Sequence, residues 1–205
     1  MFWLFLSLIF CYLIYRELTG HLPIYKPYLG LLITLALLTA WPPYHHWRVE
    51  HFLTRIAKIL AENNHAKVHC NTLFDTLFDE EVRVMGHADP KTGYIVIQYP
   101  RCATLMDYLK HPEHANIEEL FTLNLLTHES MHARGEYNEA KTECEAVQRD
   151  YRAARLLGVP HYIAKQNALD YYRKYYLKRT DMYFSKDCIP DGALDEHLND
   201  STWNE

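Results

Sequence analysis

The sequence lacks an excess of basic residues and an internal repeat, and it carries almost no charge in its first 47 positions. Its 205 residues have a formal net charge of −5, so the composition lacks the basic footprint of a nucleic-acid-binding protein. The length suits one compact domain plus an anchor. We therefore expect no nucleic-acid partner, and the uncharged start predicts contact with a lipid bilayer.

Two apolar stretches make up this uncharged start. The first, Met1 to Tyr15, lacks the basic flank and the small-x-small cleavage site of a signal peptide. The second, residues 22–41, has the roughly 20 residues that a spanning helix needs, and aromatic residues lie near both of its ends. We predict that residues 1–47 form a membrane anchor of one or two transmembrane helices. With two helices, the anchor is a helical hairpin. The alternative is that both stretches are buried core helices.

Four of the five cysteines lie in the rest of the chain, at positions 70, 102, 144 and 188. An even number in an otherwise ordinary domain predicts two disulfides and an oxidising compartment, so we expect this domain outside the cytoplasm. Two alternatives stay open. The cysteines are buried free thiols, or Cys144 is a metal ligand.

Residues 48–205 predict a mainly helical α+β domain with a short antiparallel sheet. Pro42-Pro43 ends the second apolar helix, and an amphipathic helix follows at 48–61. Strand patterns occur at residues 67–69, 82–85 and 94–99, with turn chemistry at 89–93. Helices are expected at residues 103–110, 117–134, 139–157 and 161–179.

Residues 128–132 read His-Glu-Ser-Met-His, an H-E-x-x-H motif inside the helix that Gly135 ends. Residues four apart share one helix face, so His128 and His132 can hold one metal ion together. Glu129, beside them, is the expected catalytic base. The chain has 13 histidines. The alternative interpretation is therefore that His128 and His132 are ordinary helix histidines that bind no metal, either exposed to solvent or hydrogen-bonded within the protein.

A zinc site needs a third protein ligand. The sixth residue after His132, where a metzincin has its third ligand, is Asn138, and an amide is a poor zinc ligand. A tight glycine turn and a second helix would fold the chain back on itself. This places Glu139 level with His132 and Glu143 one turn further along, so either glutamate can complete the site.

The segment Asn138-Glu139-Ala140-Lys141-Thr142-Glu143 resembles the second zinc helix of thermolysin-like gluzincins, whose N-E-A-x-x-D stretch supplies a glutamate ligand. By position, the resemblance implies that Glu139 is the third zinc ligand and that Glu143 orients His128. The chain departs from the gluzincin pattern in two ways: its loop between the two helices is much shorter, and a glutamate replaces the final aspartate.

A longer resemblance covers about residues 94–203. It consists of His-Glu-x-x-His-x-Arg-Gly, the following Asn-Glu-Ala and Glu-Cys, Leu-Gly, Tyr183-x-Ser185-x-x-Cys188 and Gly192-Ala193-Leu194-Asp195. These strings resemble a family of uncharacterised bacterial proteins, often secreted or membrane-anchored, that are predicted to be metallopeptidases. The resemblance implies a bacterial cell membrane as the location and a tail that belongs to the domain, but no established substrate.

Together these features predict a membrane-anchored zinc metallopeptidase with a zincin-like domain. A zinc-activated water would attack a peptide or protein substrate, with Glu129 as general base. The oxyanion donor stays open between Tyr137, Arg134 and His161. Residues 94–99 are either a core strand or the edge on which a peptide lies.

Two other functions stay open. One is a non-catalytic binding or scaffold protein of the cell envelope whose metal is structural. The other is a membrane scaffold in which no metal binds and the histidines and glutamates pair with one another.

Overall fold

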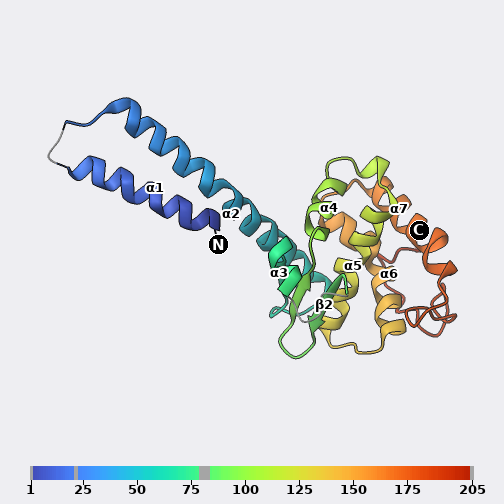
Figure 1. The fold of residues 1–205 in the computed structure, drawn as a ribbon. Coiled ribbons are helices and arrows are strands. Elements are labelled where there is room, and N and C mark those ends of the chain that lie inside the picture. Colours follow the sequence, from blue (N-terminus) through green and yellow to red (C-terminus); the bar gives the residue numbers. More distant parts are fainter. Residues whose placement is uncertain (1, 21–22, 79–83, 204–205) are drawn as a thin grey trace. The chain divides into compact units, whose positions relative to one another are not determined.

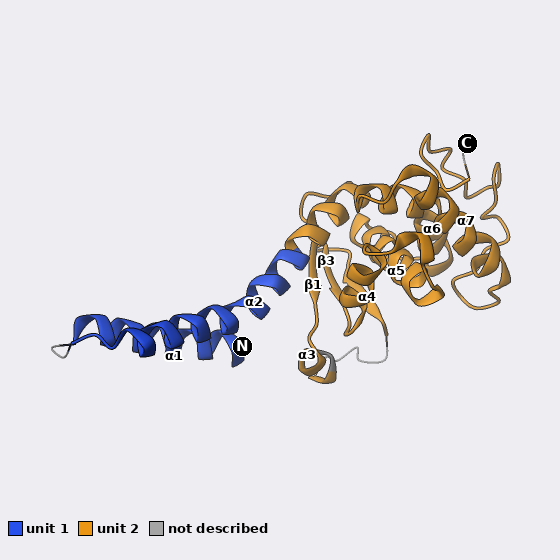
Figure 2. Ribbon diagram, turned by 90° about the horizontal axis from the view of Figure 1, so that it is seen from above, with its two compact units in different colours: residues 1–50 blue, residues 51–205 orange. Residues whose placement is uncertain are grey.

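The computed structural model describes residues 2–20, 23–78 and 84–203 (Figure 1). The chain divides into two compact units, Met1–Glu50 and His51–Glu205, coloured blue and orange in Figure 2. Helices account for 63% of the structure, and the sheet has three strands. The predicted mainly helical α+β class is therefore confirmed.

The first unit contains α1 (Phe2–Thr19) and the start of α2 (Lys26–Leu60). The two helices run antiparallel in Figure 1, and the Ser7 hydroxyl donates to the Ala36 carbonyl at 3.5 Å. None of the residues of α1 is buried. Among the described residues, α1 is the one helix long and apolar enough to cross a membrane, and a signal sequence would meet the same criterion. The described part of the second predicted span, which lies in α2, does not meet this criterion.

The predicted helix break at Pro42-Pro43 is wrong, because α2 continues through both residues to Leu60. Each proline removes one backbone hydrogen bond from the helix, since it has no N–H group. The last turns of α2 are nevertheless stabilised, because Leu53, Ile56 and Leu60 are buried in the second unit. The predicted amphipathic helix at 48–61 is therefore the end of α2.

The sheet has the strand order β1 (Lys67–Cys70), β3 (Tyr94–Ile97), β2 (Gly86–Asp89). β2 and β3 form the predicted antiparallel pair around the turn at 89–93, although β2 begins at Gly86 and positions 82–83 of the predicted strand lie outside the described residues. β1 pairs with β3 in parallel, so the sheet is mixed rather than purely antiparallel.

The position of β3 in the middle of the sheet explains why Ile95, Val96 and Ile97 are buried. Of the two alternatives for residues 94–99, the core strand is therefore confirmed over the peptide-binding edge, because the central strand is paired on both sides. The edge that lies against helix α5 is β2.

The remaining helices are α3 (Leu73–Phe78), α4 (Arg101–Tyr108), α5 (Ile117–Arg134), α6 (Glu139–Leu156) and α7 (His161–Lys174), with 3₁₀ turns η1 (Pro112–His114) and η2 (Tyr176–Lys178). Asn116 and Glu119 form a capping box at the start of α5. Gly135 ends α5 in the left-handed conformation, with φ of 117°, which glycine adopts without steric cost. Asn138 then caps α6, so the chain reverses within a few residues and the two helices pack antiparallel (Figure 1).

Two disulfides, Cys70–Cys102 and Cys144–Cys188, confirm the predicted pairing of four cysteines. Cys144 is therefore not available as a metal ligand. The second disulfide joins α6 to the C-terminal tail. The backbone amide of Thr202 also donates to the Gln148 carbonyl at 2.8 Å, and Thr202 is buried, so the tail packs as part of the second unit.

Candidate metal centre

Three potential ligand atoms meet between the end of α5 and the start of α6. The Nε2 atoms of His128 and His132 lie 3.1 Å apart. Oε2 of Glu139 lies 3.3 Å from the first and 3.4 Å from the second. In a tetrahedral zinc site with bonds of 2.0–2.1 Å, neighbouring ligand atoms are separated by about 3.3 Å. The geometry therefore permits these three residues, which we call the His-His-Glu triangle, to bind one metal ion.

The other ring nitrogen of each histidine faces a hydrogen-bond acceptor. Nδ1 of His128 lies 2.8 Å from Oε2 of Glu143, and Nδ1 of His132 lies 2.8 Å from the backbone carbonyl of Glu136. Both acceptors require a proton on Nδ1, so the Nε2 lone pairs are directed into the triangle. Two lone pairs at this separation repel each other unless a positive charge lies between them.

When no metal is bound, the charges around His128 favour a proton on its ring. Burial opposes protonation of His128, but hydrogen bonds to Glu139 and Glu143 and the charges of Glu143 and Glu129 outweigh it, raising the pKa of His128 to about 10. The hydrogen bond from His128 in turn lowers the pKa of Glu139. A proton thus supplies the positive charge in the metal-free chain, and a metal ion would replace it.

Glu143 is itself held in place on the far side of His128. Its Oε1 accepts from the Tyr171 hydroxyl at 3.2 Å and from the Arg179 guanidinium at 3.4 Å. The same Tyr171 hydroxyl lies 2.9 Å from Oδ1 of Asn124 on α5. These contacts keep the Glu143 carboxylate on Nδ1 of His128 and outside the triangle.

Glu129 lies where α5 approaches the edge strand β2. A Cβ atom added to Gly86 would lie 3.2 Å from Oε1 of Glu129 and 3.1 Å from the Val96 carbonyl oxygen. Glycine at position 86 is thus what allows strand and helix to come this close. Glu129 and the triangle both line a cleft of about 590 Å³, one wall of which is formed by residues 84–88.

Tyr137, Arg179 and Tyr183 also line the cleft. The Arg179 guanidinium lies 4.6 Å from the centre of the Tyr183 ring, which makes an edge contact with His128 at 5.6 Å between ring centres. The sequence predicts Tyr137 as a site residue, but not Arg179 or Tyr183. The one sequence signal for Tyr183 is its place at the start of the string Tyr183-x-Ser185-x-x-Cys188.

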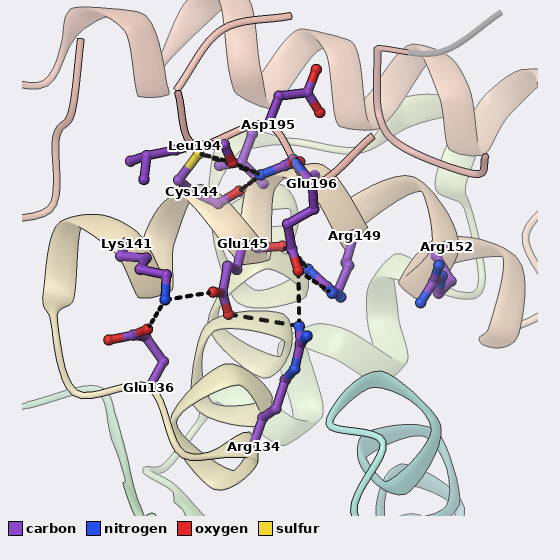
Figure 3. A network of polar contacts seen from close by, with 12 residues as sticks. Arg134, Glu136, Lys141, Cys144, Glu145, Arg149, Arg152, Leu194, Asp195 and Glu196 are labelled. Carbon is purple, nitrogen blue, oxygen red and sulfur yellow. Dashed lines mark hydrogen bonds and ion pairs between the residues drawn. The ribbon is translucent and has the colours of Figure 1, made fainter. Parts of the chain in front are cut away.

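The other two predicted oxyanion donors lie elsewhere. The Nδ1 atom of His161 is 2.7 Å from the Tyr151 hydroxyl, and His161 does not line the cleft. Arg134 belongs to a charged network that joins α5, α6 and the tail (Figure 3). It lies 3.1 Å from Glu196 and 3.8 Å from Glu145.

The same network fixes the turn between the two site helices. Lys141 pairs with Glu136 at 2.5 Å, and Glu196 accepts two hydrogen bonds from the buried guanidinium of Arg149. A second oxygen of Glu136 accepts from the backbone amides of Tyr137 and Asn138, each at 2.9 Å. The turn that places Glu139 opposite His132 is therefore held by side chains of both helices.

No protein-family model, curated protein or solved structure matches the chain. A function for it therefore has to be inferred from the His-His-Glu triangle and from the cleft that contains it.

Proposed function

We propose that the chain is a zinc metallopeptidase, anchored in a bacterial cell membrane, that cleaves peptide bonds outside the cytoplasm. The observation that carries the proposal is the spacing of 3.1, 3.3 and 3.4 Å within the His-His-Glu triangle, at the base of a cleft that also contains Glu129. The two disulfides support an oxidising compartment, and α1 supports an anchor.

The donor set fits zinc. Two imidazoles and one carboxylate are the ligands of many catalytic zinc sites, whereas structural sites usually have four protein ligands. Bound by His128, His132 and Glu139, zinc would supply Lewis acidity that polarises the peptide carbonyl and stabilises the negative charge that forms on it.

Glu129 would act as the general base of the reaction. Its carboxylate would take a proton from the attacking water and then give it to the leaving amine. Tyr183 lines the cleft with its ring against His128, and its hydroxyl would donate to the developing oxyanion. The edge strand β2 borders the cleft, and an extended substrate would lie along it by strand addition.

The non-catalytic alternative would need a closed metal site. Glu143 is the side chain best placed by sequence to close it, but its carboxylate contacts Nδ1 of His128 instead. Among the described residues, the group around the two histidines contains Glu139 and no further ligand. This difference favours the hydrolase over a structural metal site.

The proposal is tested with the full chain, purified in detergent and incubated with a mixed peptide library. Cleavage should stop on chelation, return with zinc, and be absent from Glu129→Gln although that variant still binds zinc. Cleavage at equal rates by wild type and Glu129→Gln would overturn the role of Glu129. A zinc-loaded wild-type chain that cleaves no peptide would overturn the proposed peptidase activity.

A further inference from the structure

Helix α3 presents an apolar face that no other described residue of the second unit covers. Its large apolar side chains have exposed fractions of 52% at Leu73, 72% at Phe74, 61% at Leu77 and 85% at Phe78. At about 100° per residue, these four positions form one continuous arc of roughly 140° around the helix. Adjacent exposed aromatic and aliphatic side chains of this kind mark a contact surface.

The helix is held by local capping rather than by burial. Oδ2 of Asp75 accepts from the Thr72 amide at 3.0 Å and from the Thr72 hydroxyl at 2.7 Å. The Asp75 amide lies 3.3 Å from the Thr72 hydroxyl oxygen. A helix of six residues is too short to be stable by itself. We therefore expect another surface to cover the exposed apolar arc of α3 in the protein's natural environment.

The position of α3 within the second unit indicates what that surface is. The Thr54 hydroxyl of α2 is 3.0 Å from the Val68 amide and 3.4 Å from the Val68 carbonyl. β1 therefore lies against α2 at Thr54, three residues after His51, where the second unit begins. α3 follows β1 and projects from the sheet, apart from α5, α6 and α7 (Figure 2).

His51 is where the chain enters the second unit from a segment that contains α1. α1 is long and apolar enough to cross a bilayer, and its large side chains are exposed. We propose that the Leu73, Phe74, Leu77 and Phe78 face of α3 is a second membrane contact, which enters the interfacial layer of the bilayer that holds α1. This contact rests on the proposed membrane anchor, but neither on a metal nor on peptidase activity.

The test places an environment-sensitive fluorophore on α3 in the full chain. Cys11, the one free cysteine, is replaced in Cys11→Ser, and Phe78→Cys then provides a single labelling site. The matched control is Tyr162→Cys on α7, where the native side chain is 76% exposed. The proteins are reconstituted into phosphatidylethanolamine and phosphatidylglycerol vesicles that carry nitroxide-labelled acyl chains.

We expect blue-shifted emission and severalfold stronger nitroxide quenching at position 78 than at position 162. Phe74→Cys provides a second site with the same expected result if Phe78→Cys does not fold. Equal quenching at 78, 74 and 162, in protein that floats with the vesicles, would overturn the proposal. A blue shift at 78 that rises with protein density but shows no quenching would also overturn it, in favour of a second copy of the chain.

Discussion

The carboxylate of Glu143 lies 2.8 Å from Nδ1 of His128, on the side of the ring away from Glu139. This contact keeps a proton on Nδ1, and so it leaves Nε2 facing Glu139 and His132. Carboxylates in this position also raise the basicity of a metal-binding imidazole. The orientation of His128, and not only its presence, therefore defines the candidate metal centre.

Glu143→Gln should weaken zinc binding by about 10–100-fold without abolishing it, because the amide supports His128 less well than a carboxylate. Competition with a zinc-sensitive dye measures this change in affinity. The matched control is Glu118→Gln on α5, whose carboxylate pairs with Arg101 and does not line the cleft, so zinc affinity should stay unchanged. Equal zinc affinity in Glu143→Gln and wild type would contradict the positioning role.

Zinc binding at pH 8 should release about one proton, because the pKa of His128 is raised to about 10 in the metal-free chain and zinc needs the neutral ring. Because His128 is protonated below its raised pKa, apparent zinc affinity should rise with pH up to about 10. Calorimetry in buffers of different ionisation enthalpy counts the protons. A measurement that shows no proton release at pH 8 would contradict the protonation of His128 in the metal-free chain.

Gly86→Ala should lower peptide cleavage by roughly tenfold or more while leaving zinc content unchanged. The added Cβ atom would lie 3.2 Å from Oε1 of Glu129, so the carboxylate has to move. Gly30→Ala is the matched control, because its Cβ atom would meet nothing within 4 Å. Full activity in Gly86→Ala would show that the position of Glu129 beside β2 is not needed for catalysis.

The helix pair at the site was predictable because its signals are local. The capping residues Asn116 and Asn138 and the glycine turn at 135 each act within a few residues, and they specify where α5 ends and α6 begins. The spacing of the two histidines and the two glutamates then follows from helix geometry. Whether this site belongs to a zincin-like fold stays a proposal.

The parts of the cleft that come from distant segments were not predictable in this way. Gly86 meets Glu129 because β2 packs against α5, and no pattern within either segment specifies this contact. Arg179 and Tyr183 lie after η2, in a stretch without helical or strand periodicity. The parallel pairing of β1 with β3 likewise depends on tertiary packing, and so does the passage of α2 through two prolines.

The Arg149–Glu196 ion pair should be important for stability. Arg149 is 1% exposed, so Glu196→Ala would leave a buried charge without its carboxylate partner and should destabilise the fold by about 3 kcal/mol or more. Asp200→Ala is the matched control, because it removes the partner of the less buried Arg152 and should cost about 1 kcal/mol or less. Unfolding followed by circular dichroism compares the two. Equal destabilisation would contradict the role assigned to burial.

The most direct test of the metal centre is the zinc content of the purified full chain, measured by elemental analysis for wild type, Glu139→Ala and Glu118→Ala. The His-His-Glu triangle predicts about one zinc ion per chain in wild type and in Glu118→Ala, whose side chain pairs with Arg101 outside the cleft, and loss of most of that zinc in Glu139→Ala. Zinc retained at the wild-type level in Glu139→Ala, or absent from the wild-type chain after incubation with zinc, would contradict the site.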